Sequence, residues 1–162
     1  MNIENKKFLI TGGTGSFGKT VCQFLLKKKV EEIRIFSRDE NKQHQMRKEI
    51  NDSRVSFFIG DVRDYESVLE ACSGIDYVFH AAAYKHVPLV EENPIQGLTN
   101  NIISTLEICN AAFKTKVSKI ILISSDKAVR PTNVMGASKR ISEMIIQGFH
   151  KKTQEEQLKN KD

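Results

Sequence analysis

A glycine-rich segment near the N-terminus carries the clearest chemical signal in the sequence. Gly12, Gly15 and Gly18 lie three residues apart, between a short apolar run and a segment with helical periodicity. Glycine at these points allows a sharp turn, a close approach of the backbone to a pyrophosphate and tight packing of a helix on a sheet. The free N–H groups that open such a helix attract phosphate. The predicted dinucleotide-binding residues of this segment are Gly12, Thr14, Gly15, Ser16, Phe17 and Gly18.

The segment after the second apolar run selects between the two nicotinamide dinucleotides. An NAD site usually has an acidic residue about 20 residues beyond the glycines, where it holds the ribose 2′-hydroxyl. Here Ser37 and Arg38 occupy that position, and Lys42 follows one helical turn later. Because a guanidinium pairs well with a 2′-phosphate, these residues predict NADP as the cofactor. The alternative is that Asp39 turns inward to bind NAD while Arg38 lies in solvent.

The elements that must position these residues are visible as an alternation along the chain. Apolar runs alternate with segments of helical periodicity, which is typical of a doubly wound, parallel α/β sheet with helices on both faces. Right-handed crossovers then favour the Rossmann-type strand order 3-2-1-4-5. The expected strands cover residues 7–10, 33–36, 55–59, 77–79 and 120–123, and the expected helices 16–29, 40–50, 65–72, 98–113 and 135–149. The predicted cofactor domain spans residues 1–150, and residues 151–162 are expected to form a charged, frayed tail.

The composition limits the class of protein. The 162 residues fit one domain with a buried core. No apolar run approaches the ~20 residues of a membrane span and the N-terminus lacks a signal-peptide pattern, so a cytoplasmic protein without a membrane segment is expected. The net charge of +5 comes from scattered basic residues without interleaved aromatic side chains, so nucleic acid is not expected as a partner. Cys22, Cys72 and Cys109 form no C-x-x-C pair, so a metal site is not expected. Each cysteine is expected on the side of a helix that faces the protein core.

Several further motifs resemble one group of enzymes. Together they resemble the extended short-chain dehydrogenase/reductases and, within them, the UDP-N-acetylglucosamine 4,6-dehydratases of bacterial polysaccharide biosynthesis (CapD type), over about residues 6–148. In the related dTDP-glucose dehydratases an Asp-Glu pair replaces Asp126-Lys127, and 4-epimerases lack both charged residues, so this pair favours the first group. The motifs are residues 11–18, 37–40, 60–64, 80–83, 85–88 and 124–133.

The resemblance implies a lyase that converts a UDP-N-acetylhexosamine into a 4-keto-6-deoxy sugar nucleotide, with or without epimerisation at C5. After oxidation at C4, Lys127 would remove the C5 proton and Asp126 would protonate the departing C6 hydroxyl. A lysine has a reference pKa of about 10.4, so it acts as a base only where its surroundings lower that pKa. Two alternatives stay open: a cofactor-binding module or redox sensor without catalysis, and a nucleotide-sugar 4-epimerase.

The sequence departs from the superfamily at one catalytic position. The usual Tyr-x-x-x-Lys motif reads here from Met135 to Lys139. Residues four apart share a helix face, so both still point to one place. By resemblance, Lys139 would bind the nicotinamide ribose. Met135 cannot take a proton from the sugar 4-hydroxyl, and Asp126 or Ser125 is the expected replacement.

The resemblance also assigns several weaker positions. Asp61 and Val62 would hold the adenine ring, Lys85 and His86 would lie near nicotinamide or substrate, and Asn101 would support the active site. His44, His80 and His150 are expected to be structural or solvated. Relatives of this kind continue into a C-terminal substrate domain, whereas this chain ends one helix after the fifth strand, and a homo-oligomer is expected. The small residues expected to pass the cofactor are Ala81, Ala82 and Ala83.

Overall fold

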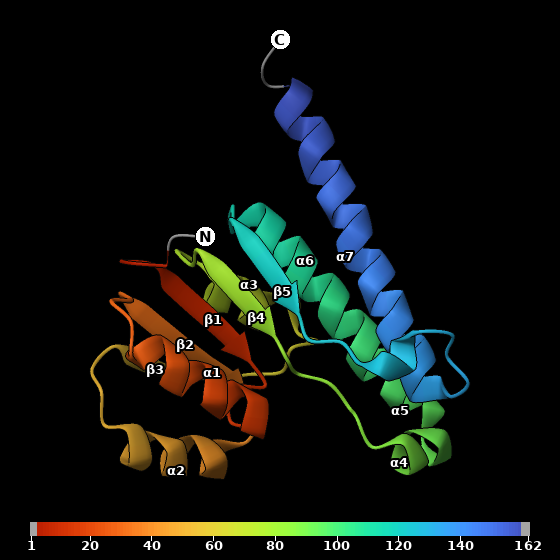
Figure 1. Ribbon diagram of the computed structural model, residues 1–162, viewed down its shortest axis with the longest axis horizontal. Helices are drawn as coiled ribbons and strands as arrows, with labels where there is room; N and C mark the ends of the chain where they lie inside the picture. Colours follow the sequence, from red (N-terminus) through yellow and green to blue (C-terminus); the bar gives the residue numbers. More distant parts are fainter. Residues whose placement is uncertain (1–2, 160–162) are drawn as a thin grey trace.

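A five-stranded parallel sheet forms the centre of the molecule, in a computed structural model that describes residues 3–159. The strands lie in the order β3-β2-β1-β4-β5, so the predicted order is confirmed (Figure 1). Each pairing is parallel, and β1 lies between β2 and β4. The strands are β1 (Lys7–Thr11), β2 (Glu32–Ser37), β3 (Val55–Ile59), β4 (Tyr77–His80) and β5 (Lys119–Leu122).

Helices cover both faces of the sheet. The helix predicted over residues 98–113 forms as three consecutive pieces, with a π-helical segment between two α-helices. A short helix after β4, which the periodicity did not predict, precedes it. The elements are α1 (Ser16–Leu26), α2 (Glu40–Ile50), α3 (Tyr65–Cys72), α4 (Val87–Glu92), α5 (Pro94–Leu98), η1 (Thr99–Ile103), α6 (Ser104–Lys114), η2 (Asp126–Ala128) and α7 (Val134–Lys159).

Alternating strand residues supply two apolar clusters, one on each face. Along β1, Phe8 and Ile10 pack with α1 and α2, whereas Leu9 packs with α3 and α6. This alternation follows from the two-residue period of a strand. All three cysteines are buried in helices, as predicted: Cys22 in α1, Cys72 in α3 and Cys109 in α6.

The last helix differs from the expectation. The apolar pattern predicts an end near Phe149 and a frayed tail from Lys151, but α7 continues to Lys159 and its last part projects beyond the sheet (Figure 1). The ammonium group of Lys152 lies 4.6 Å from the ring centroid of Phe113 and 5.9 Å from that of Phe149. These contacts attach the first turn of the expected tail to α6. The residues that follow have high helix propensity, so the helix continues although it has no apolar face there. Residues 160–162 of the expected tail lie outside the described residues.

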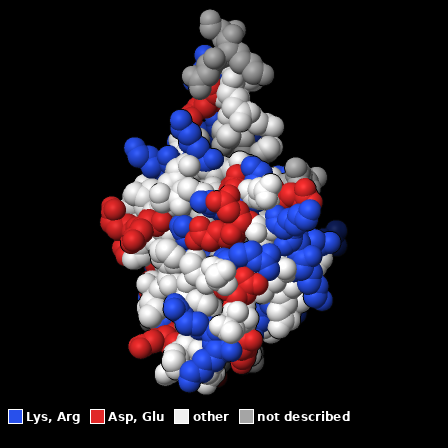
Figure 2. All heavy atoms as spheres, turned by 90° about the vertical axis from the view of Figure 1, so that its left-hand side faces the viewer, with Lys and Arg blue, Asp and Glu red and all other residues white. Residues whose placement is uncertain are grey.

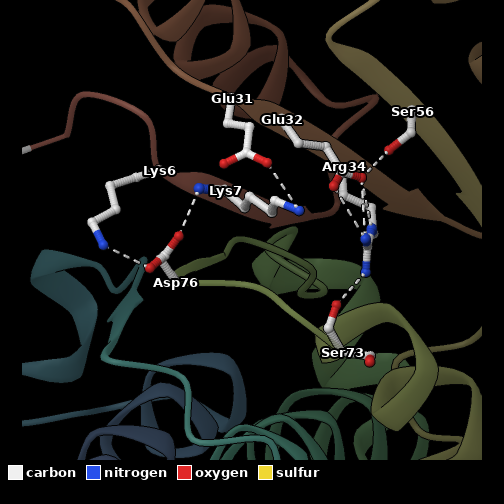
Figure 3. Close-up of polar contacts among 8 residues, drawn as sticks. All are labelled: Lys6, Lys7, Glu31, Glu32, Arg34, Ser56, Ser73 and Asp76. Atoms are coloured by element: carbon white, nitrogen blue, oxygen red, sulfur yellow. Dashed lines mark hydrogen bonds and ion pairs between the residues drawn. The ribbon is translucent and has the colours of Figure 1, made fainter.

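Polar contacts fasten the sheet at the end opposite the glycine-rich turn (Figure 3). Asp76 accepts hydrogen bonds from the Lys7 backbone N–H and from Lys6 Nζ, both at 2.9 Å, and so joins the starts of β1 and β4. Arg34 of β2 donates to the carbonyl oxygens of Ala71 (2.7 Å) and Ser73 (3.1 Å) at the end of α3. A cation at a helix C-terminus is favourable. These contacts therefore stabilise this end of the sheet, and they leave the edge beside the glycine-rich turn uncovered.

Charged side chains of both signs are interspersed on the face seen from the left of Figure 1, as Figure 2 shows. Among the described residues, no helix is long and apolar enough to cross a bilayer.

Candidate functional site

A cavity of about 830 Å³ opens at the carboxyl edge of the sheet. Residues that follow β1, β2, β4 and β5 line it, together with the first turn of α7. In parallel α/β sheets this edge gathers binding sites, because loops from neighbouring strands meet there. The predicted site residues that line the cavity are Gly12, Thr14, Gly15, Ser16, Phe17, Ser37, Arg38, Lys42, Val62, Ala81, Ala82, Ala83, Lys85, Ser125, Lys127, Met135 and Lys139.

Four predicted site residues are not among the lining residues. Gly18 lies behind the turn, where a Cβ would overlap the backbone of Gly13, and this fits its predicted packing role. Asp61 and Asp126 are each paired with neighbouring basic side chains. His86 is the exposed residue that precedes α4.

The glycine turn has the shape of a phosphate cradle. Gly12 has a φ of +63°, and a Cβ there would lie 2.8 Å from the backbone nitrogen of Ala82. Gly15 precedes α1 in an extended conformation and provides no side-chain cap. The first N–H groups of a helix lack intrahelical acceptors, so these groups are available to a ligand. The turn and its 830 Å³ cavity therefore fit a dinucleotide, with its pyrophosphate on the N-terminus of α1.

Arg38 and Asp39 line the cavity directly after β2 but have different partners. Asp39 caps α2: its carboxylate accepts the Lys42 N–H at 2.9 Å and pairs with Lys42 Nζ at 3.0 Å, and these bonds lower the Asp39 pKa. The side chain of Arg38 is 45% exposed, and its Nη1 lies 3.6 Å from Asp61. Arg63 binds Asp61 far more closely, with Nη2 at 2.5 Å, and lowers the Asp61 pKa to about 2.

Asp126 and Lys127 form the turn η2 directly after β5. Lys127 lines the cavity, and its Nζ lies 3.4 Å from the Asp126 carboxylate. The Asp126 side chain is 86% exposed, and the Ser125 hydroxyl donates to it at 3.0 Å. The Ser125 hydrogen bond and the Lys127 ammonium lower the Asp126 pKa. The pair thus stands at the rim of the cavity, with Lys127 half-exposed and the Asp126 carboxylate in solvent.

Lys139 lies deeper in the same cavity, beside Met135. The Lys139 residue is only 7% exposed, and its Nζ donates to the carbonyl oxygen of Ile123 at 2.9 Å. Burial lowers the Lys139 pKa to about 8. Nearby, the Ser124 hydroxyl donates to Glu143 of α7 at 2.6 Å. Met135 is buried and offers no proton acceptor.

The start of α7 is pressed against the turn η2. A Cβ on Gly136 would overlap the carbonyl oxygen of Lys127. This close approach fixes the backbone of Lys127 against the helix that carries Lys139.

We therefore expect Gly136→Ala to destabilise the protein by about 1–3 kcal/mol, as overpacked substitutions do. Gly148→Ala is the matched control, because it lies in the same helix with no atom within 4 Å of the added Cβ. Equal unfolding free energies of the two variants in urea would contradict the close packing of η2 on α7.

Asn101, in the π-helical segment, supports the loop after β4. Its side chain accepts the Tyr84 N–H at 2.8 Å and donates to the Tyr84 carbonyl oxygen at 3.1 Å. It also donates to the Ser138 hydroxyl of α7 at 2.9 Å. Single π-helical turns often mark functional sites. Here the turn places one amide where it fastens a loop of the cavity to α7.

His80 is structural, and His44 and His150 are exposed, as expected. His80 ends β4, where its Nδ1 lies 2.7 Å from the Thr11 hydroxyl and its Nε2 3.3 Å from the Ser104 hydroxyl. Burial lowers the His80 pKa to about 3, so the ring is neutral.

Six further residues line the cavity beyond the predicted set. Asp39, Gly60 and Ser124 lie inside the quoted motifs. Asn100 and Ile123 each adjoin a residue that the sequence singled out, so extending each motif by one residue would have found them. Tyr84 is the exception with its own contact, since its ring approaches Arg38. The six are Asp39, Gly60, Tyr84, Asn100, Ile123 and Ser124.

Comparison with known proteins places this geometry in a family. The sequence profile of the polysaccharide biosynthesis protein family matches residues 8–161. The chain belongs to this family. Over 145 residues it is 50% identical to a UDP-glucose 4-epimerase of Rickettsia bellii and 48% identical to that of Rickettsia prowazekii. These alignments cover 87% of this chain but 42% of each relative, so the chain spans less than half of their length.

Solved structures share the fold. Pen from Bacillus thuringiensis superposes with a TM-score of 0.89 at 40% identity, over 92% of this chain and 46% of that one. A UDP-glucose 4-epimerase from Bifidobacterium longum, in complex with NAD+ and UDP, gives 0.79 at 27% identity, over 89% and 49%. The dTDP-glucose 4,6-dehydratase DesIV from Streptomyces venezuelae, with NAD bound, gives 0.83 at 21% identity, over 90% and 52%, and supports the Rossmann-type fold alone.

Proposed function

We propose that this chain is the cofactor-binding part of an NADP-dependent nucleotide-sugar 4,6-dehydratase that acts on a UDP-N-acetylhexosamine. The observation that carries the proposal is the Asp126-Lys127 pair at the rim of the cavity formed by the glycine turn. Breaking a C5–H bond and a C6–O bond in one sugar needs a base and an acid close together. An amine and a carboxylate 3.4 Å apart are such a pair.

When bound, the dinucleotide supplies the hydride acceptor and donor for the sugar. Lys127 takes the C5 proton from the cavity side. The resting pair is an ammonium beside a carboxylate. Lys127 therefore acts as a base only after the sugar separates it from Asp126 and it has lost its proton, and Asp126 acts as an acid only after it has taken one up. Lys139 is fixed by the Ile123 carbonyl and would bind the nicotinamide ribose. Asp126 or Ser125 remains our candidate for the first base, at the 4-hydroxyl.

A 4-epimerase is the second candidate, because the Rickettsia relatives carry that name. The two reactions differ at C5, since only dehydration breaks a C5–H bond. The test uses a polypeptide of the relatives' full length that contains this chain. It is incubated with UDP-N-acetylglucosamine in D2O, and the product is followed by NMR. Deuterium at C5 with a 6-deoxy product supports the dehydratase. A C4 epimer with hydrogen retained at C5 would replace it with the epimerase.

NADP is the proposed cofactor because Arg38 is half-exposed at the cavity, while Asp39 is engaged as the cap of α2. Arg63 binds Asp61 more closely than Arg38 does, so the half-exposed guanidinium of Arg38 is available to a 2′-phosphate.

We expect Arg38→Ala to weaken NADP binding by about 1–3 kcal/mol, the scale of a hydrogen bond to a charged group. NAD binding should change much less, because NAD lacks the 2′-phosphate. Calorimetry on the 162-residue chain measures both. Equal losses for the two cofactors would remove Arg38 from the role of phosphate ligand.

A further inference from the structure

We propose that Arg38 and Tyr84 form a clasp over the glycine turn, which retains the dinucleotide from one turnover to the next. This inference rests on the proposed function, and it gives a role to Tyr84, which no motif assigned. Arg38 Nη2 lies 3.4 Å from the Tyr84 hydroxyl, and the guanidinium lies 5.8 Å from the centroid of the Tyr84 ring. Both residues line the cavity.

The order of the strands requires the clasp to cross the cofactor site. Arg38 follows β2 and Tyr84 follows β4, while β1 lies between these two strands. The glycine turn that follows β1 therefore lies between the two residues at the carboxyl edge. A dinucleotide seated on that turn has the sheet edge on one side and the Arg38–Tyr84 contact on the other.

The two halves of the clasp differ in mobility. The backbone of Tyr84 is held in place, because the Asn101 side chain binds both its N–H and its carbonyl oxygen. Arg38 has a long side chain that is 45% exposed and only a 3.6 Å ion pair with Asp61. A guanidinium stacks on an aromatic ring and still offers N–H groups to a phosphate. Arg38 is thus the part that swings aside when the cofactor enters or leaves.

Retention matches the proposed chemistry. In a 4,6-dehydration the hydride taken from the sugar returns to it, so the cofactor leaves each turnover in its starting form. Slow release of the cofactor therefore does not lower the rate of turnover.

The test is the rate at which NADPH leaves the 162-residue chain, followed by fluorescence after displacement with excess NADP+. We expect Tyr84→Ala and Arg38→Ala each to speed release by about tenfold, the scale of a partly desolvated cation–π contact. Tyr84→Phe keeps the ring and should change release by less than Tyr84→Ala. Leu89→Ala, an exposed residue of α4, is the control and should leave the rate unchanged.

A double-mutant cycle separates the clasp from a general loss of structure. The double variant Arg38→Ala/Tyr84→Ala should release NADPH no faster than Arg38→Ala alone, because both substitutions remove the same contact between the two side chains. Additive effects, or a Tyr84→Ala rate within twofold of the unaltered chain, would overturn the clasp and leave the cofactor proposal intact. Failure of the unaltered chain to bind either nicotinamide dinucleotide would overturn both.

Discussion

Lys127→Ala is expected to lower the rate of keto-sugar formation by about 10²–10⁴-fold, the contribution of a positioned acid–base group. Lys127 is the cavity-lining half of the Asp126-Lys127 pair, so its loss removes the proton acceptor at C5. NADP affinity should stay within about twofold, since the glycine turn and Arg38 are untouched. NMR of the product formed by the full-length polypeptide measures the first quantity, and calorimetry the second.

Two companion variants sharpen this result. Asp126→Asn keeps the size of the side chain but cannot deliver a proton, so it should impair product formation as well. Lys119→Ala removes an exposed lysine from the start of β5, the strand that precedes the Asp126-Lys127 pair, and should leave the rate of keto-sugar formation unchanged. Near-normal keto-sugar formation by Lys127→Ala would refute its role as the C5 base, whatever the fate of the cofactor site.

Acidification is expected to weaken the fold through His80. This histidine is 2% exposed and has a pKa of about 3 in the folded chain, against about 6.5 when unfolded. Between these values the unfolded state binds more protons, so the free energy of unfolding falls as the pH falls from 6.5 toward 3. A difference of this size corresponds to on the order of 5 kcal/mol. Below pH 3 both states are protonated, and this contribution stays constant.

Urea unfolding of the chain at several pH values measures this dependence. His80→Asn should flatten the change between pH 6.5 and 3, at a constant cost from the lost bonds to Thr11 and Ser104. His44→Gln, at an exposed position in α2, is the matched control and should keep the original slope. An unchanged slope in His80→Asn would mean that other groups govern the acid sensitivity.

Periodicity and glycine spacing are local properties, and they predicted most of this fold. The order of the strands, the turn from Gly12 to Gly18 and the burial of three cysteines all follow from patterns within short segments. The end of α7 did not follow, because the contact of Lys152 with Phe113 involves another helix. The apolar pattern did not predict the π-helical turn either. That turn matters because it places Asn101 where its side chain binds the backbone of Tyr84.

The sequence by itself determined which chemical groups stand at the carboxyl edge, because a parallel sheet brings the ends of its strands to one place. Only the tertiary structure decided how those groups pair. It engages Asp39 as the cap of α2, binds Asp61 to Arg63 and joins Arg38 to Tyr84. It also buries Lys139 beside Ile123 while Asp126 stays in solvent. Pairing and burial depend on distances between segments far apart in the chain, and no local pattern encodes them.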